Sequence, residues 1–137
     1  MTERRELQVA GLAPPIGHYT DAVLYGDLLF VSGCVALDKE RHLIGGDDPA
    51  LQMRQVLENL GRVLAAAGVG FDSVLRVTVY LTDINDRTLI NPLREEFFGQ
   101  SRPASTLVEV SSLAFPGLRV EMDAIACVSR AAPTLAI

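Results

Sequence analysis

The strongest structural signal in the chain lies in residues 47–81, DDPALQMRQVLENLGRVLAAAGVGFDSVLRVTVYL. The step Asp48-Pro49 is typical of a helix start, because Asp caps free backbone N–H groups and Pro fits the first helical position. Gly68 is typical of a helix end. Between these points apolar residues recur every three or four positions, so one side of the helix should be buried. The β-branched run Val74–Leu81 then predicts a strand.

Further elements are predicted on both sides of this segment. They are strands at Ala22–Tyr25, Leu28–Val31, Thr106–Val110 and Leu118–Val128, and a helix at Leu89–Phe98. Gly26-Asp27 favours a hairpin between the first two strands, and Pro92 indicates that the regular part of the second helix begins near Asn91. The order predicts an α+β sandwich, with two helices on one face of a sheet. Apolar side chains on the other face would need cover, so we expect a closed homo-oligomer.

Length and composition indicate one globular domain. The chain has 137 residues, of which 49% are apolar and 21% charged, as is usual for a protein with a buried core. We expect residues 1–16 to form an N-terminal tether, residues 17–128 a single domain and residues 129–137 a C-terminal tail. The N-terminus lacks the apolar stretch of a signal peptide, and no apolar run approaches the roughly 18 residues of a membrane span. We therefore expect a cytoplasmic protein that does not bind a membrane.

Charge and motifs narrow the function further. The net charge is −5, and the absence of a Lys/Arg cluster argues against a nucleic-acid partner. The sequence has no CxxC, HExxH, GxGxxG or GxSxG motif. We expect no metal site, because His18 and His42 have no Cys or carboxylate spaced to join them. Cys34 and Cys127 lie in apolar runs and are expected to be free thiols, with Cys34 the more accessible.

A series of short motifs, in order and spacing, resembles one known family. The motifs are Ile16-Gly17-His18-Tyr19, Phe30-Val31-Ser32-Gly33, Asn59-Leu60, Val77–Asp83, Asn91, Phe97-Phe98, Arg102-Pro103-Ala104 and Val120–Ala126. Together they resemble the Rid family, also called YjgF or L-PSP endoribonuclease-like. The resemblance implies a chorismate-mutase-like fold with a mixed β-sheet, and a homotrimer with a small cleft at each subunit interface. It also implies hydrolysis of reactive imines or enamines, such as 2-aminoacrylate, to a keto acid and ammonia without a cofactor.

The resemblance also implies roles for particular residues. Glu121 stands where the family's glutamate holds the attacking water, so it is the expected catalytic residue. The implied substrate-binding residues are Tyr19, Ser32, Gly33, Asn91 and Ser105. Ser105 departs from the family pattern, because it stands where an arginine clamps the substrate carboxylate. One hydroxyl does not replace a charged, bidentate guanidinium, so we expect weak activity on 2-aminoacrylate and its imine tautomer.

Each of these positions also has a purely structural interpretation. Glu121 belongs to an alternating charged pattern that is typical of a solvated strand face. Ser105 fits a strand-edge serine bonded to the backbone, and Tyr19 fits a loop aromatic that packs on a neighbour. Asn91, which precedes a proline, is typical of a helix N-cap.

Three functions remain open from the sequence. The first is a deaminase or hydrolase that acts on a small imine, enamine or 2-aminomuconate-like intermediate, with Glu121 as the general base. The second is a trimer that binds a small metabolite, expected to be a carboxylate, without turning it over, and Ser105 favours this alternative. The third is an endoribonuclease, which the acidic net charge disfavours.

Overall fold

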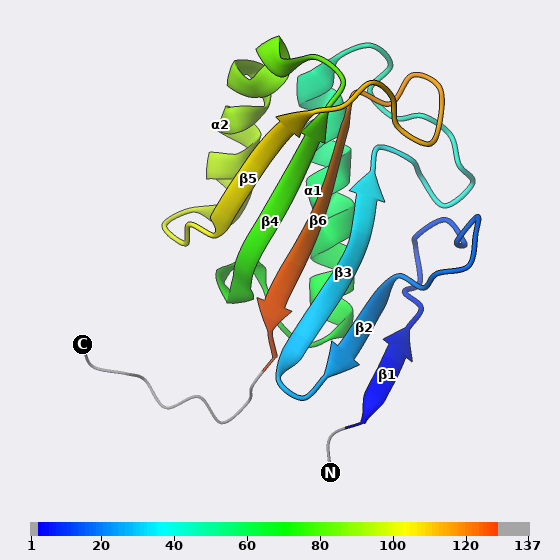
Figure 1. Cartoon of the computed structure of the whole chain (residues 1–137), viewed down its shortest axis with the longest axis vertical. Helices are drawn as coiled ribbons and strands as arrows, with labels where there is room; N and C mark the ends of the chain where they lie inside the picture. Colours follow the sequence, from blue (N-terminus) through cyan, green and yellow to red (C-terminus); the bar gives the residue numbers. More distant parts are fainter. Residues whose placement is uncertain (1–2, 129–137) are drawn as a thin grey trace.

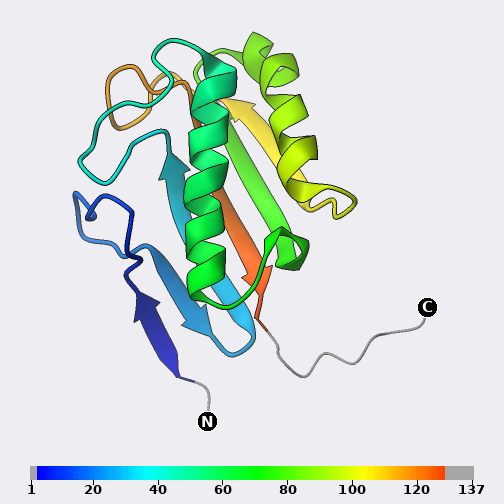
Figure 2. The ribbon, with the colours of Figure 1, turned by 180° about the vertical axis from the view of Figure 1, so that it is seen from behind.

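The computed structural model describes residues 3–128 of the chain. Its elements are β1 (Arg4–Leu7), β2 (Ala22–Tyr25), β3 (Leu28–Val35), α1 (Pro49–Ala66), β4 (Val74–Leu81), α2 (Arg87–Phe98), β5 (Ala104–Glu109) and β6 (Val120–Cys127), with 3₁₀ turns at Phe71–Ser73 and Ile84–Asp86. The strands form one sheet in the order β1-β2-β3-β6-β4-β5 (Figure 1). β4 and β5 are parallel and the other neighbours are antiparallel, so the sheet is mixed. Both α-helices cover the same face (Figure 2), which confirms the predicted α+β sandwich.

Capping and apolar burial hold α1 as its sequence predicts. Asp48 Oδ1 accepts hydrogen bonds from the backbone N–H groups of Ala50 at 2.9 Å and Leu51 at 3.3 Å. The apolar stripe packs against β3 and β6. Its buried residues include Met53, Val56, Leu57, Leu60, Val63 and Leu64, and each such side chain stabilises the fold by about 1.5–3 kcal/mol. In the part of the chain that the structure describes, no helix has the length and apolar character needed to cross a membrane.

The helix α2 begins earlier than its sequence pattern indicates. Asp83 accepts a hydrogen bond from the Asn85 N–H group at 2.9 Å and so caps a 3₁₀ turn, which leads directly into α2 at Arg87. Asn91 therefore lies inside the helix, and the predicted N-cap role is wrong. Pro92 also lies inside the helix, whereas proline usually marks the first turn, and this difference explains the misplaced start.

The N-terminal segment belongs to the sheet, which corrects the expected tether over residues 1–16. Arg4–Leu7 pairs with Ala22–Tyr25 as the edge strand β1. Thr20 Oγ1 donates a hydrogen bond to the Leu7 carbonyl oxygen at 2.9 Å, and the Val9 N–H group donates to Asp21 Oδ2 at 2.8 Å. The strand is mostly exposed, so it lacks the apolar alternation by which a strand is found in sequence. The predicted tail, residues 129–137, lies outside the described residues.

The strand β6 shows how the two faces of the sheet differ. Its residues on the helix-covered face are fully buried: Val120, Met122, Ala124 and Ala126. The intervening residues, Glu121 among them, are half-buried on the opposite face. Side chains alternate along a strand, so the pairing of β6 with β3 and β4 assigns the other central residues to one face or the other.

Candidate functional site

Glu121 lies near the start of β6, on the face of the sheet that the helices leave open. Its backbone pairs with Val35 in β3 and with Tyr80 in β4. The pairing of β3 with β6 is irregular around Gly33. A Cβ atom at position 33 would lie 2.8 Å from the Glu121 Cδ atom, so any side chain there would displace the Glu121 carboxylate. Gly33 therefore leaves the space in which the Glu121 carboxylate lies directly over the β3 backbone.

The environment of Glu121 favours a carboxylate that accepts a proton readily. Partial burial raises the pKa of Glu121, and the nearby negative charge of Asp123 raises it further. Asp123 itself accepts a hydrogen bond from the Tyr80 hydroxyl at 2.9 Å. Among residues 3–128, no group donates a hydrogen bond to the Glu121 carboxylate. Its oxygens thus retain their capacity to bind water or a ligand.

A cavity of about 80 Å³ lies beside Gly33, between the N-terminal loop, β3 and α1. Three of the expected binding residues, Tyr19, Ser32 and Gly33, line it. Ser32 Oγ donates a hydrogen bond to the Thr20 carbonyl oxygen at 2.6 Å, which ties β3 to the loop. Tyr19 is 53% exposed. The structure thus brings these three residues together around one cavity and places the Glu121 side chain against Gly33.

Cys34, next to Gly33 in β3, is the more buried of the two cysteines, and Cys127 is half-buried. The sequence predicted the opposite order. Burial raises the pKa of the Cys34 thiol to about 12, with further contributions from the negative charges of Glu121, Asp21 and Asp123. The thiolate is the reactive form of cysteine, so at neutral pH Cys34 forms a neutral part of the cavity wall.

Cys34 is expected to resist thiol reagents in the native protein. With a pKa of about 12, the thiolate fraction at pH 8 is about one in ten thousand, and the Cys34 residue is only 7% exposed. The measurement is labelling with a chromogenic disulfide on the Cys127→Ser variant, first in buffer and then in denaturant. Labelling at equal rates in the two conditions would contradict the burial.

The remaining two expected binding residues lie elsewhere, along α2 and β5. Asn91 is exposed on α2, and its Nδ2 atom donates a hydrogen bond to Glu95 Oε1 at 3.2 Å. Ser105 lies on β5 and accepts a hydrogen bond at its Oγ atom from Arg94 Nη2 at 2.9 Å. The alternative role predicted for Ser105, a hydrogen bond to the backbone, is therefore replaced by a bond to an arginine side chain. The sequence analysis missed Arg94.

Strand register shows that Ser105 and Glu121 point to opposite faces of the sheet. Ser105 pairs with Val77, which is buried beneath the helices. Glu121 pairs with Tyr80, which lies an odd number of residues from Val77 in the same strand and so points the other way. One copy of the chain therefore does not bring Glu121 and Ser105 into one cleft. The expected site residues form two groups.

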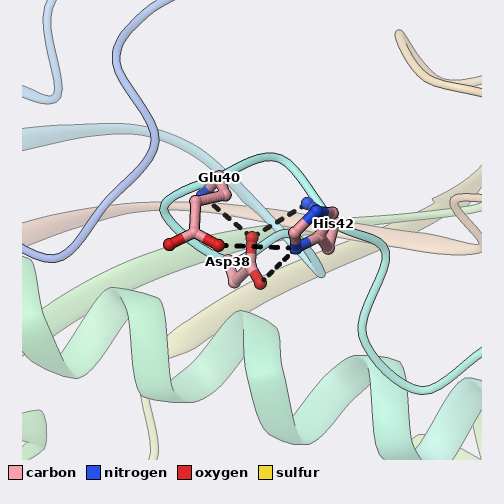
Figure 3. A group of neighbouring side chains, drawn as sticks. All are labelled: Asp38, Glu40 and His42. Carbon is pink, nitrogen blue, oxygen red and sulfur yellow. Dashed lines mark hydrogen bonds and ion pairs between the residues drawn. The ribbon is translucent and has the colours of Figure 1, made fainter.

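A tight turn after β3 carries a second feature that the sequence analysis missed. Asp38, Glu40 and His42 come together there (Figure 3), with His42 Nδ1 3.1 Å from Asp38 Oδ2 and 3.7 Å from Glu40 Oε2. This corrects the expectation that no carboxylate is spaced to join His42. The Asp38 carboxylate also accepts hydrogen bonds from the backbone N–H groups of Glu40 and His42, both at 2.9 Å. These bonds close the turn, so the grouping has a structural explanation.

Comparisons with known proteins identify the family of the chain. The family described as endoribonuclease L-PSP matches residues 10–128. A RutC family protein of Pyrococcus horikoshii is 44% identical over 112 residues, which cover 82% of this chain and 88% of that protein. The 2-iminobutanoate/2-iminopropanoate deaminase of Homo sapiens is 33% identical over 123 residues, which cover 90% of this chain and 89% of the human protein.

A solved structure supports the same relationship. The crystal structure of a Rid family protein of unknown function from Yersinia pestis superimposes with a TM-score of 0.86 at 30% identity, and covers 91% of this chain and 99% of that one. The family match spans both α-helices and every strand except β1. The motifs, the fold and these relatives agree, and the chain belongs to the endoribonuclease L-PSP family, also called the Rid or YjgF family.

Proposed function

We propose that this protein is a deaminase that hydrolyses a small carboxylated imine, enamine or 2-aminomuconate-like intermediate and releases ammonia. One observation carries the proposal: the half-buried Glu121 carboxylate, with its raised pKa, lies over Gly33, a residue that lines a small cavity. A carboxylate in such a place is suited to act as a general base toward water. Relatives named 2-iminobutanoate/2-iminopropanoate deaminase, which are 33% and 35% identical to this chain, support the reaction class.

The proposed reaction needs only water and this base. Glu121 takes a proton from water as the new C–O bond forms, and the C=N π electrons move to nitrogen. The proton then passes to the nitrogen, which makes it a better leaving group. When the C–N bond breaks, the Glu121 carboxylate takes the proton of the hydroxyl group, the C–O group becomes the carbonyl of the keto acid, and ammonia leaves. A protonated imine is already electrophilic, so no organic cofactor is required for this step.

The test is the rate of imine loss. An amino acid oxidase generates 2-iminobutanoate in the assay, and semicarbazide traps whatever imine remains, while ammonia is measured in parallel. The protein is expected to accelerate imine loss above the buffer rate and to form one ammonia for each imine. A rate equal to that of buffer, at protein concentrations where the assembly described next is intact, would contradict the proposal.

The two groups of site residues point to a site shared between copies of the chain. Large apolar residues are exposed on the helix-free face of the sheet. They are Tyr25 (53% exposed), Leu28 (38%), Phe30 (42%) and Val108 (38%). A soluble protein usually covers such a face with another subunit. With the family resemblance, this favours a homotrimer in which the Glu121 group of one subunit meets the Ser105 group of its neighbour.

The protein in solution is expected to have about three times the mass of one 14.8 kDa chain. The apolar face described above is the physical reason, since its burial stabilises association. Light scattering coupled to gel filtration at micromolar concentration measures this mass. A stable species of one chain would contradict both the trimer and the shared site.

A second candidate function is a trimer that binds a small carboxylate without turning it over. Ser105 favours this alternative, because it stands at the position of a carboxylate-binding arginine in the family that the chain resembles. Calorimetric binding of a keto acid, together with an unaccelerated rate of imine loss, would support the binding function over the deaminase. The net charge of −5 continues to disfavour ribonuclease activity.

A further inference from the structure

Arg94 is an arginine in a place that its contacts within the chain do not explain. It lies on α2 with its guanidinium directed at β5, where Nη2 donates a hydrogen bond to Ser105 Oγ at 2.9 Å. Figure 2 shows α2 running beside β5 at this edge of the sheet. Arg94 is half-buried, and this burial lowers the pKa of its guanidinium. Burial of a cation costs free energy unless an anion lies nearby.

The other half-buried arginines of the described chain have such an anion. Arg54 makes two hydrogen bonds to the Glu96 carboxylate, at 2.7 and 3.0 Å. Arg119 bonds to the Asp86 carboxylate through Nε and Nη2. Within residues 3–128, no carboxylate lies within ion-pair distance of Arg94. Its positive charge is thus left uncompensated by the part of the chain that the structure describes.

The hydrogen bond between Arg94 and Ser105 leaves unused donors on both side chains. A guanidinium carries five N–H donors in a planar fork, and Ser105 occupies one of those on Arg94. Ser105 uses its oxygen as the acceptor in this bond, so its hydroxyl hydrogen remains to be donated. The pair therefore presents a charged N–H donor and a neutral O–H donor side by side. Two adjacent donors with a positive charge match the two oxygens of a carboxylate.

We infer that Arg94 binds the carboxylate of the substrate, with Ser105 donating the second hydrogen bond. The geometry assigns the residues, and the identity of the ligand as a small 2-imino or 2-oxo carboxylate rests on the proposed function. This arrangement delivers the guanidinium from α2, whereas the family pattern that the chain resembles has it on the strand at position 105. The departure at Ser105 is then compatible with a carboxylated substrate, because the charge arrives from the neighbouring helix.

Binding of a stable keto acid tests the inference without relying on turnover. Calorimetry measures the affinity of the full-length protein for 2-oxobutanoate. Arg94→Gln is expected to weaken binding about 10- to 100-fold, because it removes a charge-assisted hydrogen bond. Arg94→Lys keeps the charge but loses the planar fork, so its affinity for 2-oxobutanoate is expected to lie between those of the wild-type protein and Arg94→Gln. In the imine assay, Arg94→Gln should raise KM by a similar factor and change kcat less.

A matched control is a second arginine whose hydrogen-bond acceptor also lies on β5. Arg76 Nη2 donates to Thr106 Oγ1 at 2.6 Å, the same kind of bond to the next residue of β5, but on the opposite face of the sheet. Arg76→Gln removes the same charge and is expected to leave 2-oxobutanoate affinity within about twofold of wild type. Light scattering on each variant confirms that the assembly is retained.

The outcomes separate this inference from the proposed function. Arg94-dependent binding of 2-oxobutanoate without any imine turnover would support the inference and contradict the deaminase. Turnover with an unchanged KM in Arg94→Gln would support the deaminase and overturn the inference. Equal loss of affinity in Arg76→Gln and Arg94→Gln, or no binding of 2-oxobutanoate to the wild-type protein at millimolar concentration, would also overturn it.

Discussion

Glu121→Gln is expected to reduce the rate of imine hydrolysis by about 100-fold or more, because a positioned general base contributes about 10²–10⁴-fold. Glutamine has nearly the same shape as glutamate, so it fits the space over Gly33 that admits the native side chain. It does not accept the proton of water, so the loss should appear in kcat. The measurement is the imine-loss assay at saturating 2-iminobutanoate, with light scattering to confirm that the variant assembles as the wild type does.

Asp123→Asn is the matched control. Asp123 lies two residues along the same strand and on the same face, where the Tyr80 hydroxyl donates to it. Its charge raises the pKa of Glu121, so the variant should keep kcat within a few-fold at neutral pH. If Glu121→Gln and Asp123→Asn lost activity equally, the effect would come from charge on this face and Glu121 would have no special role as the base.

The pH dependence of the same assay has a defined sign. A general base works in its deprotonated form, so the rate should fall as the pH drops through the Glu121 pKa, which lies above the ordinary value of 4.5. In Asp123→Asn this fall should move to lower pH, because the charge that raises the Glu121 pKa has been removed. Glu121→Gln should show no such fall in its residual rate.

Local signals explain why most of the fold was predictable. Asp48-Pro49, the apolar stripe and Gly68 each act within a few residues of α1, so propensity and capping alone identify that helix. The strand β4 is equally clear, since it combines β-branched composition with alternation. By contrast, β1 forms because an exposed, charged segment finds the free edge of β2. Edge pairing of this kind is a tertiary event and leaves no period in the sequence.

The candidate site was predictable only in part, for a similar reason. Ordered motifs identified Tyr19, Ser32 and Gly33, which do line one cavity. The sequence did not show that Ser105 faces away from Glu121, because that depends on how β4 registers with both of its neighbours. Nor did it indicate Arg94, whose relevance lies in a contact between α2 and β5. Contacts between distant elements carry no signal in a single sequence.

The ion pair between Asp86 and Arg119 is another contact between distant elements, and it holds the chain in place just before β6. Asp86→Asn is expected to lower the free energy of unfolding by about 2–4 kcal/mol. The Asp86 side chain is only 5% exposed. Its carboxylate accepts hydrogen bonds from Arg119 Nε at 3.0 Å and Nη2 at 2.9 Å. Arg119 immediately precedes β6, and its backbone N–H group donates to Gln52 Oε1 in α1 at 2.8 Å. Loss of the carboxylate leaves the guanidinium without its buried anion. Urea denaturation at fixed protein concentration measures the change.

The more exposed pair Arg54–Glu96 provides the comparison that isolates burial as the cause. Its geometry is also bidentate, with distances of 2.7 and 3.0 Å, but the two side chains are 41% and 55% exposed. Water screens such a pair, so Glu96→Gln should lower the free energy of unfolding much less than Asp86→Asn does. Equal losses in the two variants would show that burial does not set the strength of the Asp86–Arg119 pair.

Because Glu121 follows Arg119 by two residues, a strongly destabilised Asp86→Asn protein should also lose imine hydrolysis. Its activity should return in conditions that restore the folded assembly, whereas that of Glu121→Gln should not.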